Sequence, residues 1–222
     1  MTIKGIFFDA ADVFYARKES NARYAERLLR ERGYPADMSA ADAERRKALV
    51  DRASGGHISA EAYWDEVLQM YGVTAPAERA ALAEQIIEQS DAIYGLPQAR
   101  ETVQALKERG FVLSIITDTI SPLARKMRWL EQVGVAEFMD HIACSTELGV
   151  RKPDPTIYLA ALRQAGLMVE EAAFVGHDTD ELMGARRIGM KTVAVFYGAD
   201  AQADYYAESL PGLLDVPIFR ET

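Results

Sequence analysis

The sequence predicts an α/β fold with a doubly wound parallel sheet and a helical domain inserted after the first strand. Two observations support this prediction. Short apolar runs alternate with helical patterns along most of the chain, whereas residues 16–95 contain helical patterns with no strand-like run between them. Strands that alternate with helices form parallel sheets through right-handed crossovers.

Five short runs rich in Ile, Val and Phe have the composition of strands buried on both faces. They are residues 3–8, 111–116, 141–145, 173–176 and 192–197. Four segments between and after these runs place apolar residues at three- and four-residue spacing and end at or near glycine, as helices do. They are residues 97–110, 120–134, 155–166 and 181–190.

The inserted stretch contains four further amphipathic patterns, in residues 20–33, 40–53, 59–72 and 76–90. We therefore expect a core domain of residues 1–15 and 96–222 and a helical domain of residues 16–95. An apolar stripe in the third pattern predicts packing between the helices of this domain. The stripe consists of Tyr63, Trp64, Leu68 and Tyr71.

Composition excludes several classes of protein. The 222 residues are 49% apolar and 27% charged, which suits a globular chain with one core domain and a smaller appended domain. The net charge of -9 disfavours binding to nucleic acid or anionic lipid. No apolar run approaches the roughly 18–20 residues of a membrane span, and no signal-peptide pattern is present. We expect a cytoplasmic protein without a nucleic-acid or membrane partner, and Cys144 alone allows no intrachain disulfide.

Polar side chains follow the predicted strands, where the carboxyl ends of parallel strands gather chemistry. Such a set suits nucleophilic substitution at a centre that carries an anionic group. A carboxylate attacks, a hydroxyl holds the nonreacting oxygens, a lysine balances the negative charge, and further carboxylates hold a divalent cation. The candidates are Asp9, Thr117, Asp118, Lys152, Asp178, Asp180 and Glu181.

In this order, the motifs resemble those of the haloacid dehalogenase superfamily of hydrolases, and the similarity spans essentially the whole chain. The four motifs are the strand ending in Asp9, SIITDT with Thr117, GVRKPDPTIY with Lys152, and FVGHDTDELMGARRIGM. The resemblance implies a Rossmann-like core, with the helical domain as a cap that closes over the site and selects the substrate.

The resemblance also implies residue roles. Asp9, Thr117 and Lys152 would be catalytic, with Asp9 as the nucleophile. Thr117, Asp118 and Lys152 would bind the substrate. Mg²⁺ would be held by Asp9, the main-chain carbonyl of Ala11, Asp178 and Glu181.

Residues 11 and 12 depart from the phosphatases of this superfamily. Those enzymes carry a second aspartate two residues after the nucleophile, which protonates the leaving oxygen and later activates water. That position is Ala11 here. Asp12 cannot simply stand in for it, because neighbouring side chains of an extended segment point to opposite faces. Two roles are open for Asp12: a loop carboxylate bonded to nearby backbone N–H groups, or a catalytic residue. Asp12 instead occupies a position where the family usually has glycine.

His177 is a third departure, because it stands where the family usually has a metal-binding aspartate. An imidazole suits softer divalent metals better than Mg²⁺. Three roles are open for His177: a metal ligand, a hydrogen-bonding residue of the site, or a simple loop residue.

The enzymes of two branches of the superfamily lack the second aspartate and are still catalytically active. The 2-haloacid dehalogenases expel halide, which needs no proton, and have a tyrosine comparable to Tyr158. The phosphonoacetaldehyde hydrolases have alanine at the Ala11 position and form a Schiff base with a cap lysine, for which Lys47 is the candidate. A noncatalytic member that binds a phosphorylated metabolite or a protein is another alternative.

The expected function is a haloacid dehalogenase-like hydrolase that acts on a small organic anion. The expected substrate is a phosphate ester, and the reaction would pass through a covalent intermediate at Asp9. The sequence leaves open whether the protein is a monomer or a homodimer.

Overall fold

A six-stranded parallel sheet forms the core of the computed structural model, which describes residues 2–35 and 37–220. Its strand order is β5-β4-β1-β6-β7-β8. The strands are β1 (Gly5–Phe8), β4 (Val112–Thr117), β5 (His141–Cys144), β6 (Ala172–Gly176), β7 (Lys191–Val195) and β8 (Tyr205–Ala207). The prediction of a doubly wound α/β fold is confirmed, although β8 was not expected.

Alternating side chains of the strands fill two apolar layers, one on each face of the sheet. In β1, Ile6 and Phe8 belong to one hydrophobic cluster, whereas Phe7 belongs to the other. In β6, Val175 and Phe174 divide in the same way. This alternation explains why the strands read as continuous apolar runs rather than as alternating ones.

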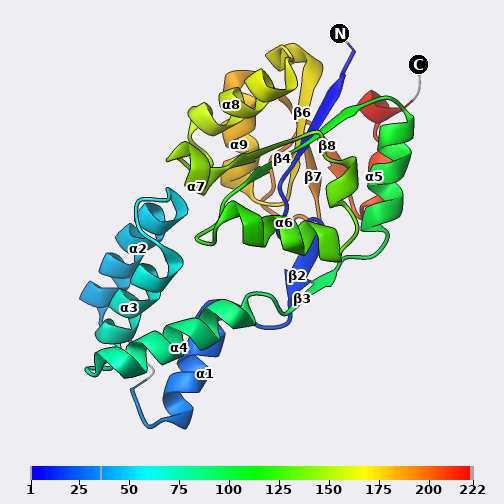
Figure 1. Ribbon diagram of the computed structural model, residues 1–222. Helices are drawn as coiled ribbons and strands as arrows, with labels where there is room; N and C mark the ends of the chain where they lie inside the picture. Colours follow the sequence, from blue (N-terminus) through cyan, green and yellow to red (C-terminus); the bar gives the residue numbers. More distant parts are fainter. Residues whose placement is uncertain (1, 36, 221–222) are drawn as a thin grey trace.

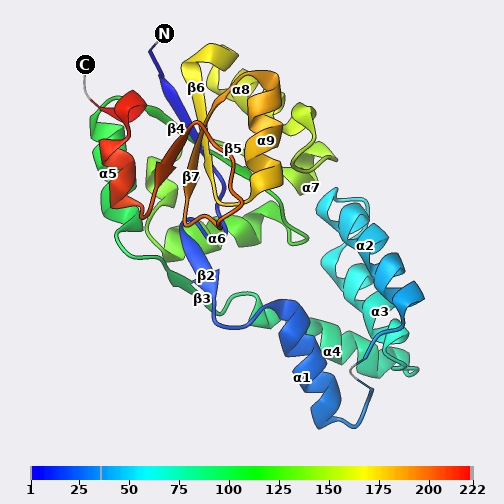
Figure 2. The same ribbon diagram turned by 180° about the vertical axis from the view of Figure 1, so that it is seen from behind.

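Helices cover both faces of the sheet (Figures 1 and 2). One layer contains side chains from α5 (Ala99–Glu108) and α6 (Leu123–Gln132). The other contains side chains from α8 (Pro155–Ala165) and α9 (Thr179–Ile188). The short helix α7 (Ser145–Leu148) follows β5 directly. Short 3₁₀ helices are η1 (Ala136–Phe138), η2 (Val169–Glu171), η3 (Pro211–Asp215) and η4 (Pro217–Phe219).

Four further helices pack on one another around a separate hydrophobic cluster. They are α1 (Asn21–Glu31), α2 (Ala40–Ser54), α3 (Ala60–Met70) and α4 (Pro76–Gln89). Serine side chains cap the first three, and Pro76 begins the fourth. The expected stripe from Tyr63 to Tyr71 is buried in this cluster. The division into two domains stays a prediction, and its ranges include residues 1, 36, 221 and 222, which lie outside the described residues.

A two-stranded antiparallel ribbon joins these helices to the sheet (Figures 1 and 2). It consists of β2 (Tyr15–Arg17) and β3 (Ile93–Gly95). The expectation that residues 16–95 contain no strand is therefore wrong at both ends of the stretch. Three-residue strands are too short to show a period of two in the sequence.

Helix α6 fastens this ribbon to the core. The Trp129 indole donates to Asp91 Oδ1 at 2.7 Å, and Arg17 lies over the Trp129 ring with its guanidinium carbon 4.5 Å from the centroid. Arg17 also donates to the Ser90 carbonyl at 2.9 Å. Both connecting segments of the chain are thus held by one helix.

A second contact links the end of α2 to the core near α7. Arg151 pairs with Asp51 at 2.6 Å. Gly56 adopts a positive φ of 69°, and a Cβ atom there would lie 2.3 Å from the Thr146 carbonyl oxygen. Only a glycine permits so close an approach of two backbones. Within the described residues, the structure has no helix long and apolar enough to cross a membrane.

Candidate active site

The carboxyl ends of three neighbouring strands bring the predicted residues together. Phe8 of β1 pairs in register with Ile115 of β4 and Val175 of β6. Asp9 follows Phe8, and its N–H donates to the Val175 carbonyl at 2.9 Å. Thr117 is the last residue of β4, so the site begins where the sheet ends.

A buried ion pair between Asp9 and Lys152 lies at the centre of this site. Lys152 Nζ donates to Asp9 Oδ1 at 2.5 Å, and the lysine side chain is fully buried. The same ammonium lies 2.8 Å from Glu181 Oε2. Burial acts to lower the pKa of Lys152, but the Asp9 and Glu181 carboxylates outweigh it and raise the pKa above its usual value. Lys152 is therefore a permanent cation beside Asp9.

Glu181 shares this ammonium from the first turn of α9. Burial raises the pKa of Glu181, Lys152 opposes this shift, and the charge on Asp9 adds to it. One lysine between two carboxylates leaves a net negative charge in a desolvated place. Such a site favours an additional positive charge.

The loop after β4 contributes Thr117 and Asp118. Thr117 is buried, and Asp118 Oδ1 accepts a hydrogen bond from the Lys152 main-chain N–H at 3.2 Å. Burial raises the pKa of the Asp118 carboxyl, which Lys152 partly offsets. Asp118 therefore holds the segment that carries Lys152.

His177 follows β6 and faces the second oxygen of Asp9. Its Nδ1 atom lies 3.7 Å from Asp9 Oδ2, which is too long for a hydrogen bond. The atom is buried and has no hydrogen-bond partner among residues 2–35 and 37–220. The two oxygens of Asp9 thus have different neighbours, Lys152 on one side and His177 on the other.

Residues 11 and 12 lie close along the chain but differ in setting. Ala11 is half-buried, and its side chain carries no functional group. Asp12 is exposed and adopts a positive φ of 56°. This left-handed backbone explains why its position suits glycine.

Two other acidic residues of the fourth motif, Asp178 and Asp180, are exposed. Asp178 caps α9, because its Oδ1 accepts from the Glu181 N–H at 3.1 Å. Asp178 is thus used differently from Glu181, which reaches Lys152.

Tyr158 and Lys47 are the two residues that would indicate other branches of the superfamily. The structure defines the contacts of both side chains. The Tyr158 hydroxyl donates to the Glu181 carbonyl at 2.8 Å, which ties α8 to α9. Lys47 has a side chain that is 76% exposed and pairs with Glu44 at 3.0 Å. A lysine that forms a Schiff base needs desolvation to lower its pKa, which Lys47 lacks.

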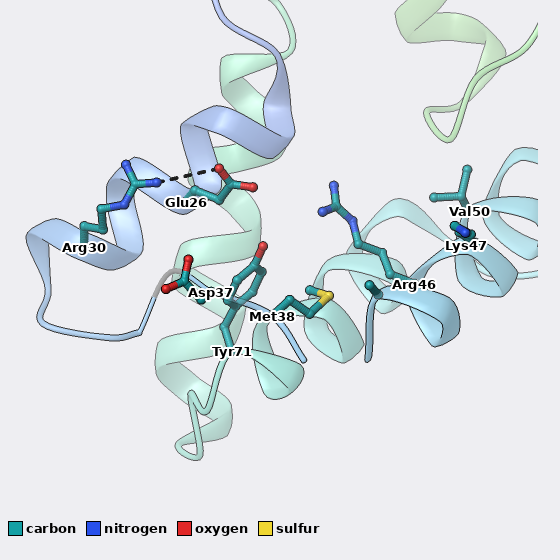
Figure 3. A pocket seen from close by; sticks show the side chains of 9 residues that line it. Glu26, Arg30, Asp37, Met38, Arg46, Lys47, Val50 and Tyr71 are labelled. Carbon is teal, nitrogen blue, oxygen red and sulfur yellow. Dashed lines mark ion pairs between the residues drawn. The ribbon is translucent and has the colours of Figure 1, made fainter. Parts of the chain in front are cut away.

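Lys47 instead lines a cavity of about 540 Å³ within the helical part (Figure 3). Arg30 and Glu26 come from α1, Arg46 and Lys47 from α2, and Tyr71 follows α3. Cationic and anionic side chains thus share this cavity, and none of the predicted catalytic residues lines it.

Lys126 is a buried residue near the site that sequence reasoning missed. Its ammonium donates to the Tyr15 hydroxyl at 2.7 Å and lies 5.5 Å from the centroid of the Trp129 ring. Burial lowers the pKa of Lys126 to about 8, although the charge on Asp9 opposes this shift. The signal was its spacing, because Lys126 shares a helical face with Trp129 and Leu130, which are both buried.

The described residues do not bring together the full set of metal ligands expected from the sequence. No group of three His, Cys, Asp or Glu side chains in the described ranges is arranged to hold a metal. Glu181 is engaged by Lys152, and Asp178 caps a helix. Asp9 Oδ2 and the unpartnered His177 nitrogen are donors that face each other, so these two side chains would meet a cation.

Comparison with known proteins places the chain in one family. The family profile described as haloacid dehalogenase-like hydrolase matches residues 6–195. A glyceraldehyde 3-phosphate phosphatase of Methanopyrus kandleri is 29% identical over 204 residues, which cover 88% of this chain and 85% of that protein. A phosphoserine phosphatase of Thermus thermophilus is 30% identical over 195 residues, covering 83% and 76%.

Solved structures agree with this placement. A 2-haloacid dehalogenase from Pseudomonas syringae pv. Tomato is 25% identical with a TM-score of 0.70, over 96% of this chain and 97% of that one. A predicted phosphoglycolate phosphatase from Haemophilus somnus shares the fold at 17% identity with a TM-score of 0.71, over 97% and 98%. The chain belongs to the family of haloacid dehalogenase-like hydrolases.

Proposed function

We propose that this hydrolase removes the phosphate group of a small organic anion through a covalent intermediate at Asp9. The observation that carries the proposal is the buried Asp9 carboxylate, held 2.5 Å from a fully buried lysine at the end of a central strand. Lys152 orients Asp9 and places a positive charge beside its carboxylate. The phosphatases among the relatives agree with this choice of substrate.

The proposed reaction has two steps. Asp9 attacks phosphorus, an aspartyl–phosphate bond forms, and the bond to the leaving oxygen breaks. Water then attacks the phosphorus, so that inorganic phosphate leaves and the Asp9 carboxylate is restored. Thr117 and Asp118 would contact the transferred group, and Lys152 would neutralise its charge. Residue 11 supplies no proton to the leaving oxygen, so the first step depends on how well that oxygen leaves unprotonated.

Phosphatases of this family generally use Mg²⁺. We propose a divalent cation next to Asp9 Oδ2, with His177 and the Ala11 carbonyl as its other protein donors. Such an ion supplies positive charge to the nonreacting oxygens of the transferred group. Asp178 and Glu181, expected as ligands from the sequence, would at most contact it through water.

The helices α1–α4 would serve as the cap over the carboxyl edge of the sheet. The ribbon that carries them begins at Tyr15, six residues after Asp9, and the end of α2 contacts the core through Asp51 and Arg151. We propose residues 16–95 as this cap and the remainder of the chain as the core. A cap placed so close to the nucleophile can exclude water during the first step.

A 2-haloacid dehalogenase reaction is the second candidate, because Ala11 removes the acid that only a phosphatase needs. Asp9 would then attack the carbon that carries the halogen and expel halide without a proton. The similarity to a 2-haloacid dehalogenase structure agrees with this reading. The exposed Lys47 disfavours the Schiff-base branch.

One panel of assays separates these reactions. The purified protein is offered small phosphate esters, acyl phosphates and 2-haloacids, and phosphate and halide release are measured with and without divalent cations. We expect phosphate release that Asp9→Asn abolishes and that Asp215→Asn, the same exchange at an exposed residue of η3, leaves intact. Turnover that survives Asp9→Asn would exclude Asp9 as the nucleophile, and halide release alone would favour the second candidate.

A further inference from the structure

The unpartnered nitrogen of His177 is the feature of the site that indicates which kind of cation would bind. A buried polar atom without a hydrogen bond costs free energy, so such atoms are uncommon unless a ligand satisfies them. His177 Nδ1 is such an atom, and Asp9 Oδ2 lies 3.7 Å from it. The pair of Asp9 and His177 therefore lacks a group that satisfies the His177 nitrogen.

The spacing of the two atoms suits one shared ion. Bonds from a transition-metal ion to imidazole nitrogen or carboxylate oxygen are about 2.1 Å long. Two donors 3.7 Å apart then subtend an angle of roughly 120° at the ion, within the range of ordinary coordination. Asp9 Oδ1 takes no part in this, because Lys152 engages it.

The donor types decide which ion binds best. Mg²⁺ prefers oxygen ligands and gains most of its affinity from carboxylate charge. His177 supplies a nitrogen and no negative charge, whereas imidazole is a good ligand for first-row transition metals.

We infer that the cation site beside Asp9 selects a transition-metal ion such as Mn²⁺, Co²⁺ or Zn²⁺ over Mg²⁺, with Asp9 Oδ2 and His177 Nδ1 as its side-chain ligands. The inference rests on the proposed function only in placing a cation beside the nucleophile. It identifies His177 as the residue that sets the metal preference.

Binding can be measured without any turnover. Metal-free protein is titrated with Mn²⁺ followed by electron paramagnetic resonance, with Co²⁺ followed by its visible absorption, and with Mg²⁺ in competition. We expect one site that prefers Mn²⁺ and Co²⁺ to Mg²⁺ by at least tenfold, a preference that exceeds the one expected for an all-oxygen site. Asp9→Asn should abolish this site, which ties it to the nucleophile.

His177→Asp is the decisive variant, since it replaces the nitrogen with a carboxylate. We expect its preference to move at least tenfold toward Mg²⁺, whereas the exposed His57→Asp makes the same exchange elsewhere and should change nothing. His177→Ala should lose affinity for Co²⁺, and circular dichroism verifies that each variant is folded.

Three results would overturn the inference: no divalent cation bound by folded wild-type protein, Mg²⁺ bound as tightly as Mn²⁺ and Co²⁺, or unchanged selectivity in His177→Asp. Because the readout is binding, each of these results is distinct from a failure to find phosphate release. A protein that binds Co²⁺ through His177 and turns over no phosphate ester would keep this inference and refute the proposed function.

Discussion

At the scale of single residues, the site combines a proposed nucleophile, Asp9, in its expected surroundings with an unusual neighbour along the chain, Ala11. Asp9 has the buried lysine and the strand-end position that the sequence predicted for it. Ala11 removes the acid that would assist a poor leaving group. The consequence is a dependence of rate on the leaving group, which one substitution can test.

Ala11→Asp should raise the hydrolysis of alkyl phosphates on the order of 100-fold, because a carboxylic acid then protonates the leaving oxygen. Aryl and acyl phosphates, whose leaving groups are weak bases, should gain much less. The measurement is kcat/KM across a series of esters of graded leaving-group pKa. An equal gain for every ester would show that residue 11 does not act on the leaving oxygen.

Lys152→Met should destabilise the fold as well as abolish turnover. Removing one partner of a buried ion pair leaves Asp9 and Glu181 uncompensated and costs about 3–5 kcal/mol. Part of the loss should return as the pH falls toward 5, because burial raises the pKa of Glu181, which then takes up a proton and loses its unpaired charge. Urea unfolding at several pH values checks this.

The control for this variant is Lys191→Met, at an exposed lysine of β7. It should leave the free energy of unfolding within about 0.5 kcal/mol of wild type. A Lys152→Met protein as stable as this control would mean that the pair with Asp9 contributes nothing to folding.

Much of the site could be predicted from residue types and order, and some of it could not. Asp9, Thr117 and Lys152 follow apolar runs, so parallel strands had to bring them to one edge. The use of Asp178 as a helix cap could not be separated from metal binding in the sequence, because both roles suit a carboxylate. The direction of His177 toward Asp9 Oδ2 depends on the turn after β6, which no periodic pattern describes.

At the scale of elements, α6 does more than cover the sheet. It carries Trp129, which holds the ribbon at Asp91, and Lys126, which donates to Tyr15 at the beginning of β2. The sequence predicted this helix but not the burial of its lysine, because a single charge in an amphipathic pattern resembles a solvated one. Likewise, the strands β2, β3 and β8 have three residues each, which is too short for an alternation of apolar and polar residues to be recognised in the sequence.

The buried Lys126 makes stability depend on pH in a predictable direction. Its pKa is about 8 in the folded protein against 10.5 in the unfolded chain. Between these values the unfolded chain binds a proton that the folded protein lacks, so stability should rise with pH, by about 3 kcal/mol in total. Below pH 8 this contribution is a constant penalty.

Lys126→Met tests the effect, because an apolar side chain of similar length removes the titration. The difference in free energy of unfolding between Lys126→Met and wild type, measured by urea from pH 7 to 10.5, should shrink as the pH rises. Lys191→Met, at an exposed lysine, should show no such trend. A difference that stays constant across this range would mean that Lys126 has an ordinary pKa in the fold.

At the scale of the whole molecule, the contacts between the helical part and the core include two at separate places. One is the β2–β3 ribbon, and the other is the end of α2, which lies beside α7 (Figures 1 and 2). Gly56 lies against Thr146 there. The fold class could be predicted because alternation of strands and helices dictates it. The second contact could not, since it joins the turn after α2 to α7, which are distant in sequence.

Gly56→Ala should separate α2 from α7. The new methyl group would lie 2.3 Å from the Thr146 oxygen, so one of the two backbones must move. Gly33→Ala is the matched control, because Gly33 also has a positive φ, of 79°, but nothing lies within 4 Å of its added carbon. In both variants, the left-handed backbone conformation of the new alanine lowers the free energy of unfolding by roughly 1–2 kcal/mol.

Small-angle X-ray scattering distinguishes the two variants. Only Gly56→Ala should increase the radius of gyration, because only this change moves the helices away from the sheet. Equal scattering from both variants would mean that this contact does not determine how far apart the two parts lie.

Arg151 and Lys152 are consecutive, yet the first pairs with Asp51 of the helical part and the second with Asp9 of the candidate site. The two parts of the chain are therefore not freely interchangeable modules. A chimera that takes residues 16–95 from a relative would inherit the wrong partner for Arg151 unless position 51 stays acidic. The mismatch would arise one residue away from the lysine that holds Asp9.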